Sequence, residues 1–367
     1  MLIPFLDLKR QFVELEAEVT AAAMRVLSGG MYVLGPEVEA FEKEWAEFCG
    51  VAGAAAVACG TNALTLALIA SGTVRKNQGD EVITSPLTSP YTALSIISAG
   101  AVPVFVDIDP LSFTLQPEEI EKAITPRTRA IVPVHLYGQL ADMLTISEIA
   151  ARRKLIVIED ASHSHGAKFT NKSAGHSLAA AYSFYPTKNL GAYGDGGVIT
   201  SKDETFIKTI KSLRQGGHNA ALHGKMEGLN SRLDEFQAAI LRVKLKRLNE
   251  WNERRRRAAM MYSAALQACP QIRVPAVVEP LAHVHHLYVI QHEKRDCLQK
   301  HLFARGVETL VHYPLLLHQQ SLFRRPSQKP LPIAEHLVND ILSLPLYPQL
   351  EDMEIVKVIE AVVGFEE

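Results

Sequence analysis

The sequence lacks several features that would mark a specialised class of protein. Its four cysteines have neither the paired spacing of a disulfide framework nor that of a metal site. It has no apolar run long enough to span a bilayer, and its opening, MLIPFLDLKRQF, has no apolar signal-peptide centre. We therefore expect a cytoplasmic protein without a membrane segment, with free thiols at Cys49, Cys59, Cys269 and Cys297.

An excess of one charge is also absent. The 38 basic residues nearly balance the 40 acidic ones, and the formal net charge at pH 7 is −2. This balance gives no electrostatic reason to expect a nucleic acid or an anionic membrane as a partner. We interpret the run Arg254–Arg257 as a solvated helix face or a subunit contact.

From about residue 54, the chain alternates between apolar strands and helical stretches. Continuous apolar strands separated by helices predict an α/β fold with a mostly parallel sheet covered on both faces. Seven strands are expected, at 54–59, 81–85, 102–107, 130–135, 155–160, 179–185 and 198–200. Helices are expected at 13–28, 35–49, 62–71, 92–99, 117–123 and 143–153. In such a sheet, ligands bind beyond the carboxyl ends of the strands.

The character of the chain changes after about residue 235. One long charged helix is expected from Asp234 to about Ala268, and short strands and helices with many prolines follow it, including a strand at 272–274. We therefore predict two domains, a large one over residues 1–245 and a smaller α/β domain over residues 246–367.

The stretch from Ala179 to Ser201 carries the most distinctive chemistry. Lys188 follows a buried strand and Tyr185, and it precedes a turn that contains four glycines. Glycines let the backbone approach another group closely. A lysine in such a pocket can lose its proton and attack a carbonyl group. A solvated lysine in a loop is the alternative when this stretch is considered alone.

Three other strand ends carry groups that suit a phosphorylated ring containing nitrogen. Gly60-Thr61-Asn62 opens a helix, so its free N–H groups and the Thr61 hydroxyl suit a phosphate, although they also suit a simple helix cap. Asp160 ends an apolar strand, where a carboxylate is costly unless it meets a cation; an N-cap or a salt bridge is the alternative. Ser183 lies close enough to Lys188 to bind the same phosphate. Together with Lys188, these groups are what pyridoxal 5′-phosphate (PLP) requires.

Nearly the whole chain also resembles the DegT/DnrJ/EryC1/StrS sugar aminotransferases, a family with the aspartate aminotransferase fold (fold type I). The similar segments include IPFLDL, GTNALTLAL, GDEVITSP, VIEDASHSHGA, YSFYPTKNLGAYGDGG, GLNSRLDEFQAAI and VHYP. The resemblance implies transfer of an amino group from an amino acid, with L-glutamate as the expected donor, to a keto sugar on a nucleoside diphosphate. Pyridoxamine phosphate is the implied intermediate. A keto-cyclitol acceptor is an alternative.

The resemblance also implies roles for single residues. Lys188 matches the Schiff-base lysine, whose presence favours amino transfer over the dehydration catalysed by relatives with histidine there. Asp160 matches the partner of the ring nitrogen, and His163 the residue beside the ring hydroxyl. Asn230 resembles the asparagine that reaches the phosphate of the other subunit, which implies a homodimer with shared active sites. The phosphate ligands would be Gly60, Thr61, the backbone of Asn62, and Ser183.

One position departs from the family pattern. Relatives commonly have an aromatic residue after the threonine that corresponds to Thr88, stacked on the cofactor ring, and this chain has Ser89. We expect Tyr91 to supply the stacking, although a register shift or a different sugar pocket would explain the change equally well.

Substrate contacts follow from the same turns. The residues expected near the sugar are Tyr185, Asn189, Tyr193, Arg232, His312, Tyr313 and His318, together with the loop 216–232. The carboxylate of the amino donor requires a cation, and both Arg214 and Arg232 are candidates.

Three alternatives were weighed against this interpretation. The 14 histidines include His163 and His165, and a group at 283–286, but no convincing third metal ligand accompanies them, so no metal is expected. Another PLP reaction, elimination or aldol-type cleavage, disagrees with the sugar-family segments. A ligand-sensing regulator with a vestigial fold would be expected to have lost Lys188 or Asp160.

Overall fold

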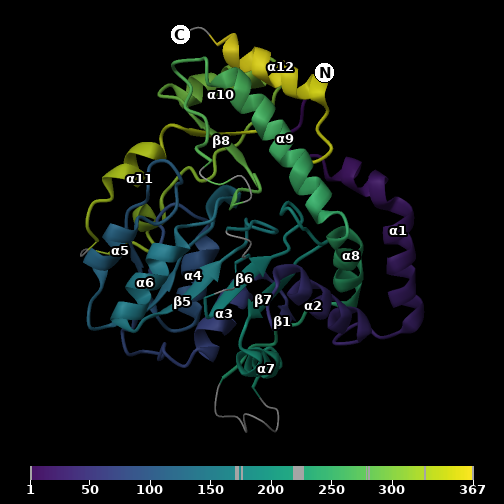
Figure 1. Ribbon diagram of the computed structural model, residues 1–367, viewed down its shortest axis with the longest axis vertical. Helices are drawn as coiled ribbons and strands as arrows, with labels where there is room; N and C mark the ends of the chain where they lie inside the picture. Colours follow the sequence, from purple (N-terminus) through teal and green to yellow (C-terminus); the bar gives the residue numbers. More distant parts are fainter. Residues whose placement is uncertain are drawn as a thin grey trace.

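A seven-stranded sheet forms the centre of the molecule (Figure 1). The computed structural model describes residues 2–169, 173–174, 177–217, 227–277, 279, 282–325 and 328–365. The strand order is β1-β7-β6-β5-β4-β2-β3; β7 runs antiparallel to β1 and β6, and the other neighbours are parallel. The strands are β1 (Gly53–Val57), β2 (Glu81–Thr84), β3 (Val102–Phe105), β4 (Thr128–Val132), β5 (Ile156–Asp160), β6 (Ala179–Ser183) and β7 (Gly197–Ser201). The predicted α/β class and mostly parallel sheet are confirmed.

Helices cover both faces of this sheet. Neighbouring residues of β6 point to opposite faces, so that Ala181 joins the core under α3, α4 and α7, whereas Ala180 joins the core under α2 and α8. On that second face, α5 and α6 cover β2 and β4. Burial on both sides explains the continuous apolar strands. The helices are α2 (Pro36–Cys49), α3 (Gly60–Ala70), α4 (Pro90–Ser98), α5 (Pro117–Ala123), α6 (Met143–Arg153), α7 (Glu204–Leu213) and α8 (Glu235–Leu245).

The prediction of a single long helix from Asp234 to about Ala268 is wrong. The structure has two helices there, α8 and α9 (Leu248–Leu266). Helix α9 begins in the cores of α8, through Leu248 and Trp251, and ends in a different core. Helix α8 packs against α2 and against α1 (Leu8–Gly29), whereas α9 extends away from the sheet and buries Tyr262 in a second core (Figure 1). The turn between them lets the later part of α9 direct its apolar side to this second core.

This second core belongs to a smaller unit that contains both ends of the described chain (Figure 1). Strands β8 (Tyr288–Gln291) and β9 (Ile341–Leu344) pair antiparallel beside α10 (Arg295–Ala304), α11 (Pro332–Leu337) and α12 (Asp352–Val363). Near the N-terminus, Ile3 bridges to Val307 and is buried in this core. The expected strand at 272–274 is only an isolated bridge between Arg273 and Gln291. None of the described helices combines the length and apolarity needed to cross a bilayer.

A buried carboxylate connects α8 to the start of α2. Glu235 is only 1% exposed, and its oxygens accept hydrogen bonds from the N–H groups of Gly35, Glu37 and Val38 at 2.8, 2.8 and 2.9 Å. These N–H groups lie at the helix N-terminus, where no intrahelical acceptor exists. Glu235 therefore caps α2 from a distant part of the sequence.

We expect Glu235→Ala to destabilise the protein by about 2 kcal/mol, because three N–H groups lose a charged acceptor. Chemical denaturation measures this change. Glu253→Ala is the control, since Glu253 is exposed and pairs only with Arg256 on the same helix. Equal stability of the two variants would contradict the capping role.

Candidate active site

Asp160 lies at the carboxyl end of β5 and is 5% exposed. Its Oδ2 accepts a hydrogen bond of 2.7 Å from the hydroxyl of Thr92, in the first turn of α4. Its Oδ1 accepts a bond of 3.2 Å from the N–H of Ser162. These donors fix the direction of the carboxylate at the edge of the sheet where ligands are expected.

Lys188 lies in the turn that follows β6, the strand next to β5. Its N–H donates to the carbonyl of Tyr185 at 2.9 Å, which fixes the backbone of the turn. Burial lowers the pKa of Lys188 to about 8, and the charge of Asp160 opposes this shift. At pH 7 a minority of the amine is therefore neutral and nucleophilic, but a far larger share than in an exposed lysine.

A narrow cradle lies where α3 begins. A Cβ atom on Gly60 would lie 2.6 Å from the Cβ of Ser183, and one on Gly197 would collide with the backbone of Cys59. The two glycines therefore let the N-terminus of α3 approach the ends of β6 and β7. The Cys59 side chain makes no capping hydrogen bond to this helix. The open N–H groups of the first turn, beside Thr61 and the Ser183 hydroxyl, suit a phosphate group.

His163 is buried beside these groups. Its Nδ1 accepts a hydrogen bond from the N–H of Tyr137 at 3.3 Å, so a neutral ring carries its proton on Nε2. Burial, followed by the charge of Lys188, holds the pKa of His163 well below its ordinary value. The neutral Nε2–H can therefore donate a hydrogen bond to the hydroxyl oxygen of the expected cofactor ring.

His286 and Asn189 support this arrangement. The ring of His286 lies 4.4 Å from that of His163, and its Nδ1 lies 3.1 Å from the Asn189 Oδ1. The Asn189 amide donates to the Asn252 Oδ1 and to the Val284 carbonyl at 2.9 and 3.0 Å. The side chain of Asn189, predicted near the sugar, is thus buried and bonded to protein groups on both its atoms.

The two candidate arginines for the donor carboxylate differ. Arg214 is buried, pairs with the Glu42 carboxylate and donates to the Ala56 carbonyl at 2.7 Å. Arg232 is exposed, as is Asn230. Most of the histidine-containing loop before them, residues 218–226, lies outside the described residues.

Among the other predicted substrate residues, His312 and Tyr313 lie within electrostatic range of the site. Burial, then the charge of Lys188, lowers the pKa of His312 to about 4. Burial, then the charge of Asp160, raises the pKa of Tyr313. Tyr185 is 53% exposed beside Lys188. His318 bonds to Glu335 at 3.0 Å.

Tyr193 and Tyr91 occupy different environments. The Tyr193 ring lies 6.3 Å from that of Phe12 of α1, and its hydroxyl is buried. The Tyr91 side chain is 62% exposed, and it is the next residue, Thr92, whose side chain bonds to Asp160. Ring stacking by Tyr91 stays a prediction.

The sequence did not identify three residues that contact site residues: Thr92, Tyr137 and His286. Thr92 was detectable as a hydroxyl in the first turn of a helix that follows a strand. Nothing local in the sequence identifies Tyr137, which acts through its backbone, or His286, which comes from a distant segment.

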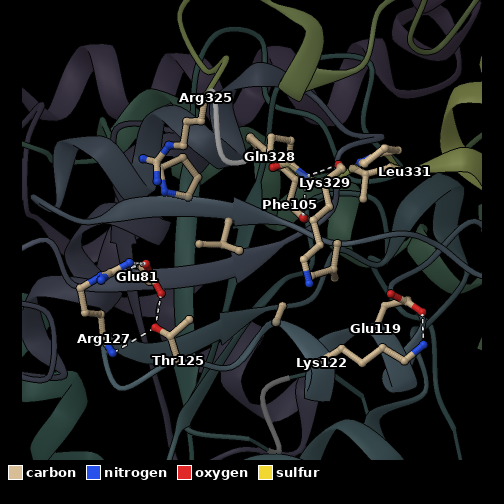
Figure 2. Close-up of a pocket in the computed structure, with 15 residues that line it drawn as sticks. Glu81, Phe105, Glu119, Lys122, Thr125, Arg127, Arg325, Gln328, Lys329 and Leu331 are labelled. Carbon is tan, nitrogen blue, oxygen red and sulfur yellow. Dashed lines mark hydrogen bonds and ion pairs between the residues drawn. The ribbon is translucent and has the colours of Figure 1, made fainter.

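A separate cavity of about 310 Å³ lies beside the edge strand β3 (Figure 2). Two ion pairs join residues that line this cavity (Figure 2). Arg127 pairs with Glu81 at 3.0 Å, and Lys122 pairs with Glu119 at 2.7 Å. Its lining contains none of the predicted site residues, and we assign it no role.

Comparison with known proteins agrees with this geometry. The model of the DegT/DnrJ/EryC1/StrS aminotransferase family matches residues 13–363. The chain belongs to this family. A dTDP-3-amino-3,4,6-trideoxy-alpha-D-glucose transaminase of Streptomyces venezuelae is 44% identical over 98% of this chain and 95% of its own. A pleiotropic regulatory protein of Geobacillus stearothermophilus is 42% identical over 100% and 99%.

A crystal structure from the same family has the same fold. S. venezuelae DesV, in complex with a ketimine intermediate, superposes with a TM-score of 0.95 at 42% identity and covers 100% of both chains. The predicted family and fold are therefore confirmed, and the chain is an aminotransferase.

The pKa of Lys188 gives a direct test of the site. Because burial lowers this pKa to about 8, we expect labelling of Lys188 by trinitrobenzenesulfonate in the cofactor-free protein to rise with pH, with its midpoint near pH 8. Peptide mass spectrometry measures the rate. A peptide with one lysine, of pKa about 10.4, is the control. A labelling profile that matches the peptide would contradict the buried site.

Proposed function

We propose that this aminotransferase binds PLP through Lys188 and transfers an amino group from L-glutamate to a keto sugar linked to a nucleoside diphosphate. The observation that carries the proposal is the placement of the half-buried Lys188 and the buried Asp160 beside a cradle that requires glycine at positions 60 and 197.

The residues present fit PLP at each of its polar groups. Asp160 would bind the ring nitrogen, the N-terminus of α3 with Thr61 and Ser183 would bind the phosphate, and the Nε2–H of His163 would donate to the ring oxygen. When bound, PLP supplies a conjugated ring that withdraws electrons from the α-carbon of an amino acid.

The Lys188 amine is suited to moving the proton in this reaction. Its pKa of about 8 lies close to neutral pH, where a general base is also an effective general acid. Once released from the cofactor, Lys188 would take a proton from the α-carbon of the donor and deliver it to the C4′ carbon of the cofactor. The buried Asp160 carboxylate would pair with the ring nitrogen and favour its protonated form.

The keto-sugar substrate is proposed from the relatives. The S. venezuelae transaminase is named for a dTDP-linked 3-amino sugar, so dTDP-linked 3-keto deoxysugars are the first acceptors to test. Tyr185, His312 and Tyr313 would contact the hydroxyl groups of the sugar. His312 lies within electrostatic range of Lys188, and Tyr313 within that of Asp160. A keto-cyclitol remains a second acceptor class for the same screen.

We also propose a homodimer with shared active sites. Asn230 and Arg232 are both exposed at the end of a loop that precedes α8. Asn230 would reach the phosphate of the other subunit. Arg232 is the better candidate for the glutamate carboxylate, because Arg214 already pairs with Glu42.

A regulator without catalytic activity is the alternative suggested by the name of the G. stearothermophilus relative. The presence of both Lys188 and Asp160, with a pKa suited to catalysis, favours an enzyme.

We expect Lys188→Ala to abolish turnover and the visible absorbance of lysine-bound PLP together, because no other side chain replaces the amine. Absorbance spectra before and after addition of L-glutamate measure both steps, with Lys246→Ala at an exposed position as the control. Full transamination by purified Lys188→Ala, or a wild-type protein that binds no PLP, would overturn the proposed function.

Shared active sites predict complementation between two defective variants. When Lys188→Ala and Asn230→Ala chains are co-expressed, a mixed dimer has one site with Lys188 from one chain and Asn230 from the other. We expect purified mixed dimers to be more active than either parent dimer. Activity no higher than the mean of the parents would argue that each site is built from one chain.

A further inference from the structure

Lys244 is a fully buried lysine that the reaction described above does not use. It lies on α8 and is 0% exposed. Its Nζ donates a hydrogen bond of 2.7 Å to the carbonyl of Gly191, and it lies 4.2 Å from the centre of the Tyr193 ring. Both contacts fall in the turn that carries Lys188.

Among the described residues, no carboxylate forms an ion pair with the Lys244 ammonium. A buried ammonium without an anion is costly. Burial alone lowers the pKa of Lys244 to about 7. The carbonyl of Gly191 and the face of the Tyr193 ring are its compensation, since aromatic faces attract cations.

The turn itself is closed tightly around Lys188. A Cβ atom on Gly191 would collide with the backbone of Pro186, so the two ends of the segment 186–191 touch. The N–H of Ala192 donates to the Phe184 carbonyl at 2.8 Å. Any displacement of Gly191 must therefore move the segment that contains Lys188.

Helix α8 holds this turn at two points. About two helical turns before Lys244, the side chain of Gln237 accepts a hydrogen bond of 2.8 Å from the N–H of Tyr193. Residues 237 and 244 lie seven positions apart and share one face of the helix. Lys244 thus acts with Gln237 as a clamp on the residues that follow Lys188.

We propose that Lys244 is a positioning residue for Lys188. The Nζ of Lys244, which can donate an N–H to the carbonyl of Gly191 in either protonation state, holds the turn beside Tyr193 and so sets the direction of the Lys188 amine. The charge of Lys244 is not among the causes of the pKa shift of Lys188, which are burial and Asp160. Lys244 therefore acts through the geometry of the turn and not through its electric field. The inference rests on the proposed PLP chemistry of Lys188.

The test compares Lys244→Met with Lys246→Met in the intact holoenzyme. Lys246 is exposed on the same stretch of chain and is the matched control. For Lys244→Met we expect kcat to fall about tenfold or more, with the KM for glutamate within about twofold, because misplacement of a reacting group costs rate and not binding. We also expect an altered visible circular dichroism of bound PLP and an unchanged midpoint of the pH–rate profile.

The outcomes separate the inference from the proposed function. Wild-type kcat and wild-type dichroism in Lys244→Met would overturn the positioning role, and so would a shifted pH midpoint, which would indicate an electrostatic one. If Lys244→Met does not fold, Lys244→Gln decides, because it keeps an N–H donor without the charge: we expect a partial loss of kcat, and wild-type kcat would overturn the inference. Failure of the wild-type protein to bind PLP would instead overturn the proposed function.

Discussion

The site depends on the burial of an acid and an amine at the ends of two neighbouring strands. Asp160 ends β5, and Lys188 follows β6, whose register with β5 places Ala181 opposite Asp160. Burial lowers the pKa of Lys188, whereas the charge of Asp160 raises it. The resulting pKa of Lys188, about 8, reflects this balance. A small change in the depth of either group would change the fraction of nucleophilic amine.

Close backbone approach gives the site its second property. Gly60 and Gly197 bring the start of α3 against the ends of β6 and β7, and Gly191 closes the turn on Pro186. Side chains at these positions would separate the helix N-terminus from Lys188. The same short distances let one compact ligand meet the helix N-terminus, the amine and the carboxylate together.

The histidines beside the site are held neutral chiefly by burial, and hydrogen bonds fix their rings. His163 accepts from the backbone of Tyr137, and His286 bonds to Asn189, which in turn bonds to Asn252. Such a satisfied network limits the positions that its members can adopt. Helix α8 adds Lys244 and Gln237 to the turn after Lys188 and, through Glu235, also fixes the start of α2.

The sequence by itself determined the alternation of strands and helices, and hence the parallel sheet and the strand ends that carry Asp160, Ser183 and Gly60, because apolar periodicity and turn residues are local properties. It failed where the outcome depended on distant packing. The division of the expected 234–268 helix follows from two cores that lie in different directions. The burial of Asn189, the pairing of Arg214 with Glu42, and the contacts of Thr92 and Lys244 were decided only by the tertiary structure, because each joins segments that no local pattern relates.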